Sequence, residues 1–187
     1  GTKCHSQENN RSFNHVRATL EEDTDENSHT LLDLSVDTAW DEIAADLDQI
    51  DAVTDDATVV SDGDSGLTAA FTDTKRTHQL DLVHVGRTLG HRLLVDDIFP
   101  LKTRKEIVSE VVDEVFHLKN SVLKHHPEEE FEAIRERIAL TRERISKTAW
   151  QLEQLDSKKA AGYLRRWLPS ITTFAEAVLD GFEVPWT

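Results

Sequence analysis

Residues 57–63 have the sequence ATVVSDG, a short apolar run that ends in Ser61, Asp62 and Gly63. An apolar run of this length without alternation predicts a strand that is buried on both faces. In open α/β sheets, ligands gather at the carboxyl ends of the strands. The stretch therefore predicts an α/β fold and places the carboxylate of Asp62 where such folds perform their chemistry.

The segments before this strand predict a hairpin followed by a helix. Residues 12–20 show a modest alternation of side chains, and residues 30–36, TLLDLSV, alternate clearly. The polar, acidic residues 21–29 between them predict a turn. Asp37 or Thr38 is suited to cap the helix that follows, where apolar residues recur at helical spacing.

The segments after Asp62 become helical toward the C-terminus. A short helix is expected at residues 66–71 and a strand at 78–85, and helical stripes begin near residue 86. One stripe contains Leu89, Leu93, Leu94 and Ile98, and a stronger one runs from Ile107 to Val122. Pro127 and the glutamates after it suit the first turn of a long helix, and Pro169 predicts an interruption in a later one.

This order of elements matches a ribonuclease-H-like α/β core that lacks its first strand and carries a large all-α insertion. Residues 1–86 are assigned to the core and residues 87–187 to the helical insertion. The first strand lies at the centre of that fold, so its loss would leave buried backbone groups unpaired. Together with the absence of methionine, this leads us to expect a piece of a longer protein.

The chain has 36 acidic and 21 basic residues, which gives a formal net charge of −15. The apolar periodicity argues against disorder as the cause, and adaptation to molar salt, where the Debye length is only about 3 Å, explains it better. Such acidity counts against DNA binding unless basic faces exist locally. The single cysteine, Cys4, fits a reducing cytoplasm, and no apolar run approaches the roughly 20 residues of a membrane span.

Asp62 is the sharpest candidate for a reactive group. Two-metal phosphoryl transfer requires carboxylates at such strand ends, because Mg²⁺ prefers oxygen ligands. The alternative is that SDGDSG, residues 61–66, is simply an acidic turn after a strand. Asp64 is a second candidate that lies further into the turn.

Two segments resemble the second-aspartate region of Mutator-like DDE transposases, above all the haloarchaeal insertion-sequence members: VVSDGDSGL at residues 59–67 and HQLDLVHVGRTL at residues 78–89. In that family a strand ends in Asp-Gly, and a short helix and a Cys-or-Asp-x-x-His motif follow. Here that motif is Asp81-Leu82-Val83-His84, with Arg87 after it. GTKCHSQ resembles the residues just after the family's first catalytic Asp, and GFEVPWT resembles those before its Ser/Asn-x-Ile-Glu-Arg motif.

The resemblance implies a parent enzyme that cleaves DNA strands and transfers them during transposition, with Mg²⁺ or Mn²⁺ held by two Asp and one Glu. Only Asp62 carries over as a catalytic carboxylate and metal ligand, so the chain by itself is expected to be inactive. Asp81, His84 and Arg87 carry over as a motif without an assigned role. His84 is equally well explained as a structural histidine bonded to Asp81. The implied partners are transposon ends, target DNA and further copies of the enzyme.

Six basic residues near the C-terminus are weak candidates for contacts with DNA phosphates. They are Arg135, Arg142, Lys158, Lys159, Arg165 and Arg166. Interleaved glutamates favour a solvated, ion-paired helix face instead. Two further functions stay open: a transposase remnant that binds DNA or a partner without cutting, and a different ribonuclease-H-like nuclease.

Overall fold

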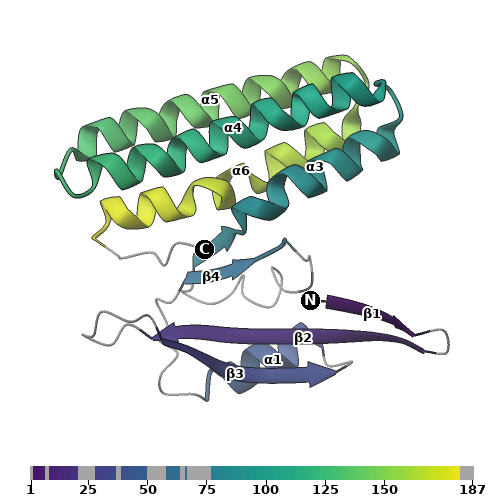
Figure 1. The fold of residues 1–187 in the computed structure, drawn as a ribbon, viewed down its shortest axis with the longest axis vertical. Coiled ribbons are helices and arrows are strands. Elements are labelled where there is room, and N and C mark those ends of the chain that lie inside the picture. Colours follow the sequence, from purple (N-terminus) through teal and green to yellow (C-terminus); the bar gives the residue numbers. More distant parts are fainter. Residues whose placement is uncertain are drawn as a thin grey trace. The chain divides into compact units, whose positions relative to one another are not determined.

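The computed structural model describes residues 2–6, 9–20, 28–36, 39–49, 58–63, 66 and 77–181. Contacts divide the chain into two units, residues 1–78 and 79–187, whereas the sequence predicted a boundary at residue 86. The fold is α/β with a helical part (Figure 1).

The first unit contains an antiparallel sheet of three strands in the order β1-β2-β3. The strands are β1 (Thr2–Ser6), β2 (Asn9–Leu20) and β3 (Ser28–Val36). β2 and β3 form the predicted hairpin, with Phe13 opposite Val36 and a bulge between Val16 and Arg17. The alternation in the sequence was therefore a sound guide to this pair.

β1 is a strand that the sequence analysis did not predict. It pairs antiparallel with β2, and Thr2 lies opposite Phe13. Residues 2–6 carried no prediction, because Thr2–Ser6 is too short and polar to show an apolar alternation. Backbone hydrogen bonds to a neighbouring strand do not require that alternation.

Helix α1 and strand β4 follow in the first unit. α1 (Trp40–Leu47) buries Ile43 and Ala44. Its N-cap is Ala39, which makes no side-chain cap bond, and the predicted caps Asp37 and Thr38 lie outside the described residues. β4 (Thr58–Ser61) is present as predicted, but only Ser61 is buried, so burial on both faces was also wrong.

β4 pairs with β5 (Thr77–Leu80) in a parallel sheet of two strands. The described strands thus form two separate sheets, where a ribonuclease-H-like core predicts one. The helix expected at residues 66–71 falls outside the described residues, apart from Gly66.

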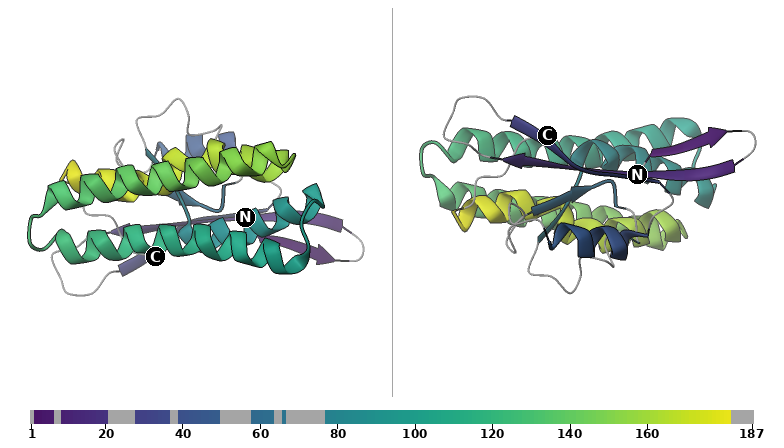
Figure 2. Two further views of the ribbon diagram at one scale, coloured as in Figure 1. Left: turned by 90° about the horizontal axis from the view of Figure 1, so that it is seen from above. Right: turned by 90° about the horizontal axis from the view of Figure 1, so that it is seen from below.

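The second unit is built from four helices. They are α3 (Leu82–Asp96), α4 (Leu101–His125), α5 (Phe131–Gln154) and α6 (Lys158–Leu179). α4 and α5 lie side by side as a helical hairpin (Figures 1 and 2). α6 packs against both α5 and α3, and α3 also packs against α4.

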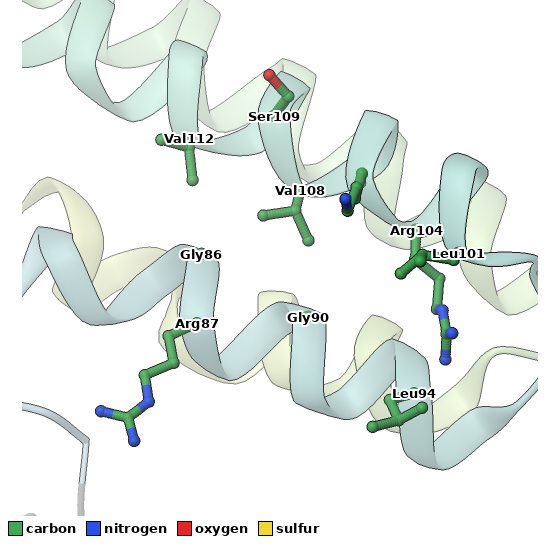
Figure 3. Close-up of a pocket in the computed structure, with 10 residues that line it drawn as sticks. Gly86, Arg87, Gly90, Leu94, Leu101, Arg104, Val108, Ser109 and Val112 are labelled. Carbon is green, nitrogen blue, oxygen red and sulfur yellow. The ribbon is translucent and has the colours of Figure 1, made fainter.

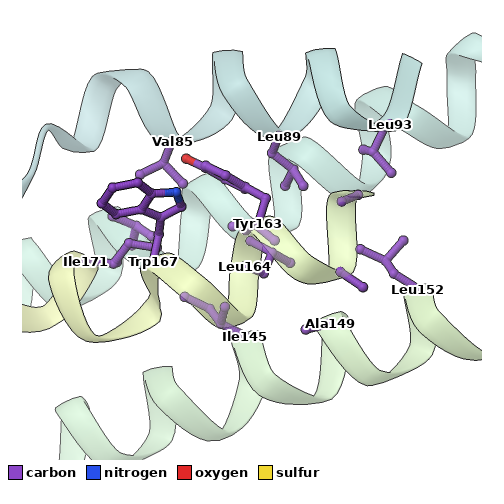
Figure 4. Close-up of a cluster of buried hydrophobic side chains, with 14 of the residues drawn as sticks. Val85, Leu89, Leu93, Ile145, Ala149, Leu152, Tyr163, Leu164, Trp167 and Ile171 are labelled. Carbon is purple, nitrogen blue, oxygen red and sulfur yellow. The ribbon is translucent and has the colours of Figure 1, made fainter. Parts of the chain in front are cut away.

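Apolar stripes at helical spacing supply the core between these helices. The larger cluster joins Leu89 of α3, Ile145 of α5 and Trp167 of α6, and Figure 4 shows these side chains converging. A second cluster joins Leu118, Ile134 and Phe174. Fully burying one such aliphatic side chain contributes about 2 kcal/mol, so these stripes account for most of the stability of the helical unit.

Two side chains fix the ends of elements in this unit. The carboxylate of Asp96 accepts hydrogen bonds from the Ser157 hydroxyl at 2.7 Å and from the backbone N–H groups of Lys159 and Ala160, so it caps α6. The buried Gln79 of β5 accepts a hydrogen bond from the backbone N–H of Phe174 at 2.8 Å. The latter bond ties the end of β5 to α6.

Several predicted helix boundaries were wrong. Pro127 lies in the turn before α5 and not, as predicted, in the first turn of the helix. Glu129 in that turn has a left-handed φ of 56°, and α5 begins only at Phe131. Pro169 lies inside α6, where buried residues on either side hold both halves of the helix against one core.

The first helical stripe also ends earlier than predicted. Ile98 lies beyond α3, which ends at Asp96 before the left-handed Asp97 with a φ of 53°, and it is exposed. Leu94 lies within α3 but borders a surface groove and is also exposed. Leu89 and Leu93 are buried as their spacing predicts.

Candidate functional site

Asp62 lies directly after β4 and is half-buried. The next residue, Gly63, has a φ of 84°, in the left-handed region that favours glycine. Its backbone N–H donates to the Ser61 hydroxyl at 3.2 Å. The turn that presents Asp62 is therefore built by its two sequence neighbours.

Ser61 also connects β4 with β5. Its Oγ lies 2.7 Å from His78 Nε2, and at the other end of the pair the hydroxyls of Thr58 and Thr77 lie 3.0 Å apart. Burial lowers the pKa of His78, so the imidazole is neutral at pH 7. Nothing in the spacing of Ser61 and His78 along the sequence indicates this contact.

The Asp-x-x-His motif forms the N-terminus of α3. Asp81 Oδ1 accepts a hydrogen bond from the backbone N–H of Val83 at 2.9 Å, which makes Asp81 the N-cap. His84 Nε2 lies 3.6 Å from Asp81 Oδ2. Because Asp81 caps the helix here, residues 82–85 are helical, and the predicted strand at 78–85 was wrong beyond Leu80.

Arg87 lies one turn beyond His84 on the same helix and is exposed. Figure 3 shows its guanidinium pointing away from α4. The structure thus places the His84 imidazole near the Asp81 carboxylate, at a separation longer than a hydrogen bond, and leaves Arg87 at the surface.

The described residues do not by themselves fit a catalytic metal site. Within the described ranges, no group of three or more His, Cys, Asp or Glu side chains is arranged to hold a metal ion. Asp62 and Asp81 belong to different units, and Asp64 lies outside the described residues. A two-metal site needs carboxylates from several elements, and the described residues around Asp62 do not supply such a set.

The basic residues of α5 and α6 are mostly paired with carboxylates. The pairs are Arg135 with Glu132 at 3.3 Å, Arg142 with Glu176 at 2.8 Å, Lys158 with Asp156 at 2.8 Å, and Arg165 with Glu153. Of the other two candidates, Arg166 lies over the Trp167 ring at 5.1 Å, and the backbone N–H of Lys159 donates to Asp96. This arrangement matches the ion-paired face and weakens the case for DNA contacts here.

A buried ionic cluster between α4 and α5 was also missed. The Glu114 side chain is only 8% exposed and accepts from Arg137 at 2.5 Å, Arg144 at 2.8 Å and the Thr141 hydroxyl at 3.0 Å. These partners are 23 to 30 residues away in sequence. The cluster fixes how the two helices align, since a shift of either would leave a buried charge unpaired.

Comparison with known proteins gives no relative. No family model matches the chain, and no curated protein or solved structure is significantly similar to it. Among the described helices, none is both long and apolar enough to cross a membrane.

Proposed function

We propose that this chain is an internal segment of a DDE transposase, with Asp62 as the second catalytic carboxylate. The supporting observation is local geometry at Asp62: an aspartate placed directly after β4 by a glycine turn. The next strand, β5, also leads directly into an aspartate, Asp81, which caps α3 and lies near His84. These are the two motifs on which the family resemblance rests.

The order of the described elements also supports a ribonuclease-H-like core. An antiparallel meander of β1, β2 and β3 is followed by α1 and then by β4 and β5. On this proposal β1 (Thr2–Ser6) would belong to the first strand of the core, which the order of elements in the sequence had predicted to be missing. The four helices of the second unit would form the insertion between the second Asp and the Glu.

The role of the chain's own residues in such an enzyme is to hold one carboxylate in place. Gly63 sets the turn after Asp62, and the Ser61–His78 contact secures β4 against β5. Mg²⁺ or Mn²⁺, when bound to the assembled carboxylates, would supply electrostatic stabilisation of the phosphoryl group. DNA ends, target DNA and further copies of the enzyme are the proposed partners, in the cytoplasm.

The rival proposal is a remnant that binds DNA or a partner without cutting. Because the cations of α5 and α6 are paired with carboxylates, we expect any DNA binding through this face to be weak. Fluorescence anisotropy at high salt, with terminal-repeat and random DNA, separates the two. Tight binding that prefers terminal repeats, without any nicking in Mg²⁺ or Mn²⁺, would support the remnant.

The transposase proposal is tested by transposition of an element that encodes this chain within a longer open reading frame. We expect Asp62→Asn to abolish excision and Asp64→Asn, its matched neighbour, to retain it. Loss of excision in Asp64→Asn alone would move the catalytic role to Asp64, and full activity of Asp62→Asn would refute the proposal.

A further inference from the structure

A groove lies between α3 and α4 on one face of the helical unit. Its volume is about 520 Å³, within the range of roughly 300–1,000 Å³ that is common for small-molecule sites. Gly86 and Gly90 of α3 face Val112 and Val108 of α4 across it (Figure 3). Because glycine has no side chain, α3 and α4 approach closely at Gly86, where a Cβ would lie 2.6 Å from Val112 Cγ2, and the floor of the groove at Gly90 is bare backbone.

The lining is apolar along its length. Leu94 and Leu101, at the end where α3 leads into α4, are 53% and 59% exposed. Exposed leucines that border a hollow lose contact with water when an apolar ligand covers them. From Gly86 to Leu94 the groove extends over about 12 Å of helix, at about 1.5 Å per residue.

The charged side chains of the groove all carry the same sign. Arg104 and Lys105 of α4 line it, Arg87 of α3 borders it with its guanidinium directed away from α4 (Figure 3), and its lining in the described structure contains no carboxylate. The first turn of α4, from which Arg104 extends, contains no acidic residue, and its N-cap Pro100 makes no side-chain cap bond. In a chain of net charge −15, this is a local site of positive potential, which the N-terminal end of the α4 dipole strengthens.

Arg104 indicates what kind of group would suit the groove. Its Nη1 atom is shielded from solvent and has no hydrogen-bond partner among the described residues. A desolvated guanidinium N–H without an acceptor is unfavourable, and a carboxylate is its natural partner. Figure 3 shows the side chain extending toward the part of α3 that carries Leu94.

We propose that the groove between α3 and α4 binds an amphiphilic carboxylate. The carboxylate pairs with the guanidinium of Arg104, and the apolar chain lies over Gly90 against Val108. This proposal is independent of Asp62 and of the transposase assignment, because all of its residues lie in the helical unit.

The test uses the full chain and decanoate as the probe. The protein has seven glycines, so selective ¹⁵N-glycine labelling gives a simple spectrum. We expect decanoate to shift the Gly86 and Gly90 signals and to leave Gly162, which has open space around it on α6, unchanged. Decyltrimethylammonium, which has the same chain and the opposite charge, should bind at least about tenfold more weakly.

Two pairs of variants locate the site by calorimetry. Arg104→Met should weaken decanoate binding by about tenfold or more, whereas Arg135→Met, at an exposed position on α5, should not. Gly90→Leu should fill the groove and abolish binding, whereas Gly162→Leu should not. Equal affinity for both detergents, or unchanged decanoate binding in a folded Arg104→Met protein, would overturn the proposal.

Discussion

Replacing Glu114 by Gln should destabilise the helical unit far more than the loss of an ordinary surface charge. The substitution keeps the shape of the side chain and its bond to Thr141 but removes the charge that faces Arg137 and Arg144. Arg137 is only 16% exposed, so its guanidinium stays largely buried without a counter-charge. Removing one partner of a buried pair costs about 3–5 kcal/mol.

We expect the lower end of that range, about 3 kcal/mol, because Arg144 is 54% exposed and can turn to solvent. The assay is urea unfolding followed by circular dichroism at 222 nm, with linear extrapolation to zero urea. Glu132→Gln is the matched control, since Glu132 and its partner Arg135 are 77% and 58% exposed. That exposed pair should contribute less than about 1 kcal/mol.

The salt dependence separates the two pairs further. Screening at about 1 M salt removes interactions between exposed charges and affects buried ones much less. The cost of Glu114→Gln should therefore persist at high salt. A cost below about 1 kcal/mol, equal to that of Glu132→Gln, would refute the view that this cluster aligns α4 and α5.

Three other predictions concern the helical unit. Gly86→Ala should be less stable than Gly162→Ala by about 1–3 kcal/mol in urea unfolding, because a Cβ at Gly86 would lie 2.6 Å from Val112 Cγ2 while one at Gly162 meets nothing within 4 Å. Burial acts to raise the pKa of Asp96, but hydrogen bonds from Ala160, Ser157 and Lys159 outweigh it and hold the pKa below its usual value. Its contribution to stability is thus present above about pH 4 and lost as the pH falls through the folded pKa, and Asp96→Asn should flatten this acid limb of the unfolding free energy. Burial raises the pKa of Tyr163, the only tyrosine, to about 12, so its absorbance at 295 nm should titrate near pH 12 when folded and near pH 10 in urea, and stability should fall between these values. A native midpoint near 10 would contradict the burial of its hydroxyl.

Periodic apolar patterns in the sequence predicted the strands and helices that bury one face. Alternation identified the hairpin of β2 and β3, and the helical stripes identified α4 and α5, because burial of one face imposes a period on the sequence. β1 escaped this reasoning because its stability comes from backbone pairing with β2. Prediction from periodicity is therefore weakest for short, polar edge strands.

Predicted element boundaries were wrong where one capping side chain, or packing against the core, decides whether a segment is helical. Residues 78–85, HQLDLVHV, alternate like a strand, yet the Asp81 carboxylate caps α3 and ends the strand at Leu80. Pro169 has a low intrinsic preference for helix interiors, but packing of Trp167 and Ile171 against one core overrides it.

The candidate site was predictable only in part. The position of Asp62 after a strand followed from the sequence, because an apolar run and a glycine are both local signals. The Ser61–His78 contact and the Glu114 cluster were not predictable, since each joins residues 17 or more positions apart that no period links. The same limit applies to the groove between α3 and α4, which depends on how two helices meet.

The most direct test of the central claim is excision of a DNA element by the longer transposase that we propose contains this chain, assayed with Asp62→Asn. The account predicts that this variant loses Mg²⁺- or Mn²⁺-dependent strand cleavage at the terminal repeats while the protein remains folded. The Asp64→Asn variant of the longer protein should remain active. The purified 187-residue chain by itself should be inactive. Undiminished cleavage by Asp62→Asn would contradict the assignment of Asp62 as a catalytic carboxylate.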